Sequence, residues 1–301
     1  LPGRNVTVED LSLQNTLQRL RDPDTAEAVD SLAGNLEGAV SVSYAMSADT
    51  QADVRDIVFN DAGGGFTTGL ASTSRWYTGV EYIDSGATST AERELKGTIP
   101  LEYLLQYQQS TNTVDVSLTM GYADEDRNTS ITPGTITGPT DGSEVPFHGV
   151  TLDVDGATVQ KLQSMSLSIS NISRFHRGPS RTAVDAVLAA PETTLDMTAI
   201  YSTTDYTELA YGGAGTTTTQ DQLSNVSGTI TLDSAGSTVE TVRVNGRIVL
   251  HDSGGLAGQF VIEPSRYETA TLRFEGGTAQ VGIESTPLRT EKATLRVTVD
   301  D

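Results

Sequence analysis

The stretch Ser164-Met165-Ser166-Leu167-Ser168-Ile169-Ser170-Asn171 decides the fold class of this chain. Its three apolar side chains alternate with serines. Because successive side chains of a β-strand point to opposite faces, this period of two predicts a strand with one buried and one wet face. The same alternation occurs at 114–120 and at 195–199. The sequence therefore predicts a mainly β protein made of half-buried strands.

An order of elements occurs twice, at offsets of about 125 to 131 residues. In each half an alternating strand precedes a capped stretch that we expect to be helical, from Asp49 to Phe59 and from Ser180 to Ala190. Chance matches would scatter in offset, so the repeated order predicts a weak internal duplication. Two further pairs carry it: Tyr77-Thr78 with Tyr82 and Tyr206-Thr207 with Tyr211, then Gly97-Thr98-Ile99 with Leu101 and Gly228-Thr229-Ile230 with Leu232.

The chain is expected to divide into an arm and two β domains. In residues 1–34, Thr7 can cap a helix that carries several leucines, Asp22-Pro23 can open a second helix, and Gly34 can close it. This pattern predicts a helical N-terminal arm. The first β domain is expected over 35–160, with a long loop near 121–146, and the second over 161–301.

A hairpin is predicted near the C-terminal end of the second β domain. Asn245-Gly246 separates two short alternating segments, and both positions of a two-residue hairpin turn need positive φ.

The charge balance narrows the classes of partner. The formal net charge is -21, and only three of the cationic residues are lysines. At molar salt the Debye length falls to about 3 Å and screens such a surface, so the composition suits a protein of a halophile. A soluble acidic protein of a mesophile is the alternative. Sequence-specific DNA binding is disfavoured, because basic clusters for phosphate contacts are missing.

Motifs for chemistry are incomplete. The segment at 251–255 is similar to the nucleophile loop of trypsin-like proteases, but His251 stands where a glycine should precede the aspartate. Asp153 and Asp155 resemble the start of a calcium loop, yet Ser164 occupies the position of the closing glutamate. The chain has no cysteine. We therefore expect no enzyme, no cofactor and no metal site.

No apolar run approaches the roughly 18 residues needed to cross a bilayer, so no membrane association is expected. Four asparagines stand in Asn-x-Ser/Thr sequons, which would matter on an extracellular or virion surface and which arise often by chance in a chain rich in Ser and Thr. They are Asn5, Asn128, Asn171 and Asn225.

The stretch Val150–Gly213 resembles tail tube proteins of tailed phages. It combines the alternating strand at 164–171, an Arg/Gly-containing loop through Gly178, and Asp205-Tyr206 before Tyr211-Gly212-Gly213. The first half is similar to the same family at two places: Trp76-Tyr77-Thr78-Gly79 and Gly121-Tyr122-Ala123-Asp124-Glu125. The resemblance covers most of residues 35–275, and the acidic composition would place it in a virus of halophilic archaea.

The resemblance implies duplicated tail-tube-type β-sandwich or barrel domains with short flanking helices. Their sheets would join around a ring, and stacked rings would form the tube of a virion tail, through which double-stranded DNA passes without specific binding. Two tube domains per chain favour a ring of three chains with pseudo-six-fold symmetry, and one domain per chain would need six. Tape measure and tail terminator proteins would be the other partners.

Three regions are expected to make assembly contacts: the arm, the loop around 124–140 and the loop at 174–181. Arginines of the last loop can meet a neighbour's carboxylates with bidentate geometry. The alternative is an arm folded on its own domain and ordinary solvated loops. The residues are Leu13, Leu17, Leu20, Asp124, Glu125, Arg174, His176, Arg177 and Arg181.

Two other functions compete with the tail tube. A secreted or surface-layer β protein of a halophile, such as an adhesin, would explain the acidity and the sequons equally well. A distal tail or baseplate hub protein would share the tube domain and cap the tube.

Overall fold

The computed structural model describes residues 1–21, 28–58, 75–84, 87–127, 138–189, 191–200, 205–222, 224, 226–252, 257–263, 271–274, 278–284 and 294–300. Most of them lie in strands, so the predicted mainly β fold is confirmed. The strands are β1 (Arg4–Arg21), β2 (Ala28–Ala45), β3 (Arg75–Asp84), β4 (Ala87–Gln108), β5 (Asp115–Arg127), β6 (Val150–Val154), β7 (Ala157–Thr158), β8 (Leu162–Ser170), β9 (Ser173–His176), β10 (Asp185–Leu188), β11 (Glu192–Ile200), β12 (Val226–Ser234), β13 (Ser237–Asp252), β14 (Ala257–Glu263), β15 (Thr271–Phe274), β16 (Thr278–Glu284) and β17 (Thr294–Asp300).

Helical structure is sparse in the described part of the chain. It consists of α1 (Gln51–Val58), α2 (Asp205–Tyr211) and a 3-10 turn at Phe147–Gly149. The helix predicted from Asp49 to Phe59 is thereby confirmed as α1. Neither helix is long and apolar enough to span a membrane.

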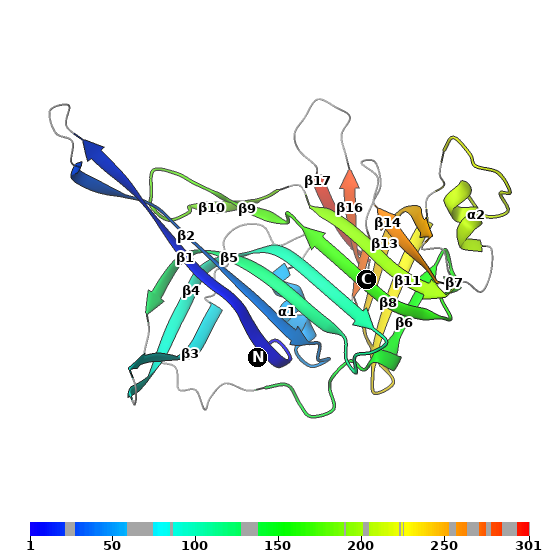
Figure 1. Cartoon of the computed structure of the whole chain (residues 1–301), viewed down its shortest axis with the longest axis horizontal. Coiled ribbons are helices and arrows are strands. Elements are labelled where there is room, and N and C mark those ends of the chain that lie inside the picture. The colour runs from blue at the N-terminus through cyan, green and yellow to red at the C-terminus, as the bar shows by residue number, and fades with distance from the viewer. Residues whose placement is uncertain are drawn as a thin grey trace.

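One antiparallel sheet runs through the whole molecule (Figure 1). Its strand order is β1-β2-β5-β4-β8-β11-β14-β13-β12-β6-β7, with β3 also paired to β4 and β15 to β13. The two halves meet where β4 pairs with β8. Strand β6, which falls in the predicted first domain, pairs with β12 of the second. The two predicted domains therefore share one sheet.

Alternation along the strands sets the core. In β8 the serines are half-buried, whereas Met165, Leu167 and Ile169 are almost completely buried. The pairing of β4 with β8 places Leu105 opposite Leu167, so buried side chains of both halves lie on one face. Strands β6 and β12 contribute to the same core, which α1 joins through Val54 and Val58.

The predicted helical arm is wrong: residues 4–21 and 28–34 lie in β1 and β2, which pair antiparallel as two long strands. The leucine spacing fits a helix, but pairing with β2 satisfies the backbone and places Leu11 opposite Val40. Tertiary pairing outweighs the weak local helix preference. Strand β5 pairs with β2 only over Gly38–Ala45, so the rest of the hairpin extends beyond its neighbour (Figure 1).

Two other expectations of local structure are also wrong. Residues 185–188 form β10, which pairs with β9, where a helix was expected from Ser180 to Ala190. Asn245-Gly246 makes no hairpin turn: both residues lie inside β13 and pair with β12. The β-branched Val187 of β10 favours a strand, and pairing with β12 holds the Asn-Gly pair extended inside β13.

The repeated motifs agree only in part. Gly97-Thr98-Ile99 and Gly228-Thr229-Ile230 both lie in strands, β4 and β12. Tyr77-Thr78 lies in strand β3, whereas Tyr206-Thr207 lies in helix α2. The internal duplication stays a prediction.

The side chain of Tyr122 holds β1 and β2 against β5. Tyr122 of β5 is fully buried and lies opposite Gly38 of β2, and a Cβ atom at Gly38 would lie 1.9 Å from the Tyr122 Cζ atom. The ring passes over this glycine, and its hydroxyl donates to the Ser12 carbonyl of β1 at 2.7 Å. Burial raises the pKa of Tyr122 to about 12, so the phenol stays protonated as a donor. Three strands are thus joined by one side chain.

Gly38→Ala is predicted to lower the free energy of unfolding by about 1–3 kcal/mol, because the added methyl overlaps the Tyr122 ring and forces it to move. Gly138→Ala is the matched control, since nothing lies within 4 Å of a Cβ atom there. Denaturant unfolding of both variants in molar salt measures the difference. Equal stability of the two variants would contradict this account of Tyr122.

Candidate assembly surfaces

The predicted contact residues of the arm lie on an edge strand. Leu13 of β1 is 43% exposed and lies opposite Gly38 of β2. Leu17 and Leu20 follow in the same strand, opposite Ala33 and Asp30 of β2. The hairpin brings the three leucines onto one strand, and their role in assembly stays a prediction.

The acidic residues at the end of β5 have partners within the chain. The Arg93 guanidinium forms an ion pair with the Glu125 carboxylate and donates to the Tyr122 hydroxyl at 3.1 Å. Lys96 of β4 pairs with Asp126, and it lies opposite Asp124 in the strand register. The charges of β4 thus complement those of β5. This part of the predicted long loop is strand up to Arg127, and residues 128–137, with the sequon Asn128, lie outside the described residues.

The arginine loop clamps the hairpin of its own chain. Arg177 forms an ion pair with Glu37, and its guanidinium also lies 3.4 Å from the Leu36 carbonyl. Arg181 donates to the Gly34 carbonyl at 3.2 Å, and its own carbonyl accepts from the Leu36 amide at 3.0 Å. These contacts fix β2 where it leaves β5. Two of the predicted arginines therefore bind a strand of the same chain.

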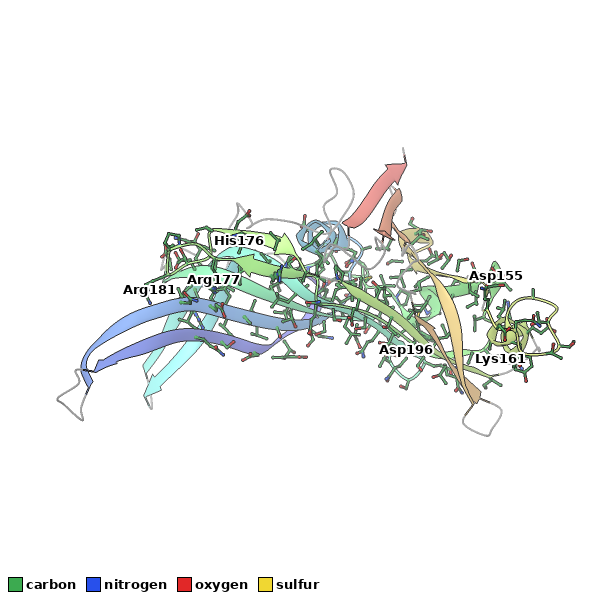
Figure 2. All side chains as sticks on the ribbon, turned by 90° about the horizontal axis from the view of Figure 1, so that it is seen from above. Asp155, Lys161, His176, Arg177, Arg181 and Asp196 are labelled. Carbon is green, nitrogen blue, oxygen red and sulfur yellow. The ribbon has the colours of Figure 1, made fainter. Side chains whose placement is uncertain are left out.

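Strand β9 carries the other two predicted residues of this region. Arg174 and His176 are both exposed, and Figure 2 shows His176 and Arg177 close to Arg181 above the sheet. Between them, Phe175 packs on the sheet, because a Cβ atom at Gly121 would lie 3.1 Å from its ring. Gly121 leaves the space that this aromatic ring fills.

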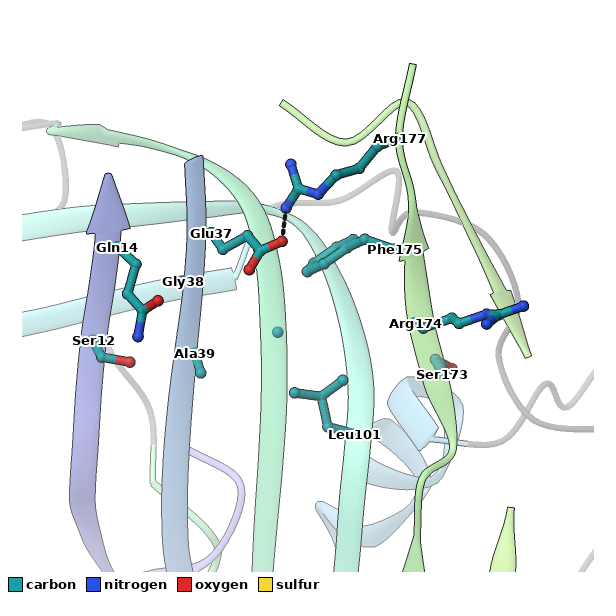
Figure 3. A pocket seen from close by; sticks show the side chains of 11 residues that line it. Ser12, Gln14, Glu37, Gly38, Ala39, Leu101, Ser173, Arg174, Phe175 and Arg177 are labelled. Atoms are coloured by element: carbon teal, nitrogen blue, oxygen red, sulfur yellow. Dashed lines mark hydrogen bonds and ion pairs between the residues drawn. The ribbon is translucent and has the colours of Figure 1, made fainter. Parts of the chain in front are cut away.

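A groove lies between β9 and the hairpin (Figure 3). Its volume is about 400 Å³, and its walls combine backbone and side chains of β1, β2, β5 and β9. The Arg177–Glu37 ion pair crosses its rim in Figure 3, and Phe175 points into it. The described residues contain no group of three or more His, Cys, Asp or Glu that could hold a metal ion.

Sequence reasoning missed the contact that fixes the loop after β5. The Asp49 carboxylate accepts hydrogen bonds from the Thr140 amide at 2.6 Å and from the Ser143 hydroxyl at 2.9 Å. Arg4 pairs with Asp141 and Glu144 of the same loop. The sequence offers one indication of this contact: Asp49 is an acidic residue just before a helix, and its carboxylate can bind a distant loop as well as cap the helix.

Comparison with known proteins gives one match. The profile of a family of unknown function, DUF7263, matches residues 197–300. No curated protein matches the chain. The matched region spans the end of β11, α2 and the strands β12 to β17, and the hairpin, the arginine loop and the first half of the chain lie outside it.

Arg177→Glu is predicted to release the β1–β2 hairpin, since it replaces an ion pair with a repulsion beside Glu37. We expect faster amide hydrogen exchange in β2 around Leu36, with a stability loss of about 1 kcal/mol or less because the pair is near the surface. Arg174→Glu, on an exposed position of β9, is the matched control with the same charge change. Identical amide exchange in both variants would contradict the claim that the Arg177–Glu37 ion pair holds β2 in place.

Asp49 gives a pH prediction. The hydrogen bond from the Thr140 amide holds the pKa of Asp49 below its usual value. A lowered pKa in the folded state stabilises the fold above the unfolded-state pKa, and this contribution disappears as the pH falls through the folded value. Asp49→Asn should therefore cost about 1 kcal/mol at pH 7, a small figure because the carboxylate is exposed, and nothing near pH 2. Unfolding of both proteins across this range measures it, and a pH-independent difference would contradict it.

Proposed function

We propose that this chain is a structural virion protein that assembles into rings, which stack into a tail tube for genome delivery. The observation that carries the proposal is the open sheet. Strand β1 pairs only with β2 among the described strands, over most of its 18 residues. A long unpaired strand edge is a template for pairing with another chain.

The strand order ends at the opposite side with β7, a strand of two residues that pairs only with β6 among the described strands. The two ends of the sheet therefore differ, with a long β1 at one end and a short β7 at the other. Unlike ends favour a heterologous contact between copies, and such contacts close into rings when the rotation between copies divides a circle.

The β4–β8 pairing, which joins two β units in one chain, affects how many chains we expect in a ring. Two β units linked through β4 and β8 within one sheet are compatible with duplicated tube domains and favour three chains over six. The net charge of -21 requires screening by salt for the copies to approach. Tape measure and tail terminator proteins remain the other proposed partners.

No contact among the described residues favours the surface-layer or adhesin alternative. It differs from the tail tube in the particle mass that it predicts in solution. A monomer or a planar lattice would be expected in place of a hollow ring. Light scattering in molar KCl, with negative-stain images of the same fraction, separates the two. Particles with a central hole support the tail tube, and a strict monomer at all salt and protein concentrations contradicts it.

Leu13→Lys is predicted to weaken assembly without unfolding the monomer. The leucine is exposed on β1, and an ammonium group at a strand edge must lose its water when a second chain pairs there. Val184→Lys is the matched control, because Val184 is 54% exposed in the loop before β10. Light scattering at constant salt compares the variants. Equal loss of assembly in both would show a general charge effect.

A further inference from the structure

An exposed aromatic side chain stands at one end of the strands. Phe147 is 38% exposed and begins the 3-10 turn Phe147–Gly149, which we call the Phe147 turn. The turn is held on two sides. The Phe147 amide donates to the Asn112 carbonyl at 3.1 Å, and a Cβ atom at Gly149 would lie 2.1 Å from the Asp233 carbonyl oxygen. An apolar ring is therefore presented to solvent in a fixed position.

The groove between β9 and the hairpin offers space for such a ring, and we call it the β9 groove. Small residues line its strand side, among them Ser12, Ala39 and Gly121, whereas the ring of Phe175 lines the other side (Figure 3). Its volume of about 400 Å³ exceeds that of one aromatic side chain. Aromatic rings also attract one another beyond the effect of buried area. The β9 groove therefore suits an aromatic side chain from outside.

The Phe147 turn and the β9 groove lie at opposite ends of β2 and β5. Just before the turn, the Val145 amide donates to the Met46 carbonyl, and the Val145 carbonyl accepts from the Val114 amide, where β2 ends and β5 begins. The groove lies over Gly121, about 20 Å further along β5. Figure 1 shows residues 138–149 at the lower edge of the sheet and β9 at the upper edge. Phe147 therefore cannot enter the groove of its own copy.

The two ends carry opposite charges. Residues 138–149 contain two carboxylates and no lysine or arginine, whereas residues 173–182 contain three arginines and no carboxylate. Ion pairs within the chain neutralise part of each charge, through Arg4 at the first end and Glu37 at the second. The Asp141 side chain nevertheless stays 98% exposed. Opposite charges orient two copies as they approach, and the apolar contact persists when molar salt screens them.

We propose that the Phe147 turn of one copy inserts into the β9 groove of the next copy, so that chains join end to end along their strands. The contact buries the Phe147 ring against Phe175 and brings residues 138–149 toward the arginines of residues 173–182. A contact between unlike ends can repeat without closing and then forms filaments. The inference goes beyond the proposed function and does not need it, because the same contact joins successive rings of a tube or successive rows of a planar lattice.

The absence of cysteine allows a direct test, because introduced thiols can be linked without background. His148→Cys places an exposed thiol beside Phe147, and Arg174→Cys places one at the β9 groove. The two full-length variants are mixed in molar KCl and treated with a short bis-maleimide. The mixture should give a linked dimer, whereas each variant alone should give almost none, because like ends do not meet.

Two further substitutions test the insertion itself. Phe147→Ser in the His148→Cys chain should lower the yield of linked dimer at least about tenfold, since it removes the buried ring. Ala39→Leu in the Arg174→Cys chain should lower it similarly by filling the groove. Tyr211→Ser in the His148→Cys chain is the matched control, because Tyr211 is 37% exposed on α2, and it should leave the yield unchanged.

Three results would overturn the inference: no dimer in the mixture, equal dimer in the single variants, or an unchanged yield with both Phe147→Ser and Ala39→Leu. The proposed function is decided separately, by a central hole in the assembled particles. Linked dimers in filaments or sheets without a hole would contradict the tail tube and support the contact. Hollow particles without the mixed link would do the reverse.

Discussion

The antiparallel pairing of β4 with β8 is the contact on which the rest of the structure depends. Among the described strands it is the pairing that makes one sheet of the two halves, and its register aligns Leu105 with Leu167 and Tyr107 with Met165. A slip by one residue would turn these side chains from the core to the wet face. The single core follows from this register, because buried side chains of both halves then lie on one face.

Alternating segments could be predicted from the sequence, because burial on one face imposes a period of two. This period predicts the strands at 114–120, 164–171 and 195–199, whereas α1 is predicted from the capping residue before it. The hairpin of β1 and β2 could not, since its leucines fit either a helix or a strand and only the partner strand decides. Arg177 and Arg181 are predicted from the sequence as contacts with a neighbouring chain, and that role stays a prediction. Their contacts with the hairpin of the same chain could not be predicted, because they join residues about 140 apart that no local pattern contains.

Two contacts of the fold fix the position of the β1–β2 hairpin. Tyr122 fixes β1 and β2 to β5 across Gly38, and the arginine loop holds β2 where it leaves the sheet. The hairpin is thereby oriented with its outer edge open. An edge that is held rigidly loses less conformational entropy when it pairs, which favours association between copies. The acidic surface opposes that association until salt screens it. Surface charges therefore control assembly, whereas the buried side chains determine the fold.

Hydrogen–deuterium exchange of the assembled and unassembled protein tests the central claim most directly, because it reports which backbone amides gain partners. The account predicts new protection in β1, the edge strand, with the interior strands β8 and β11 unchanged. Assembled particles in which the β1 amides exchange as fast as in the monomer would contradict edge pairing and the ring built on it.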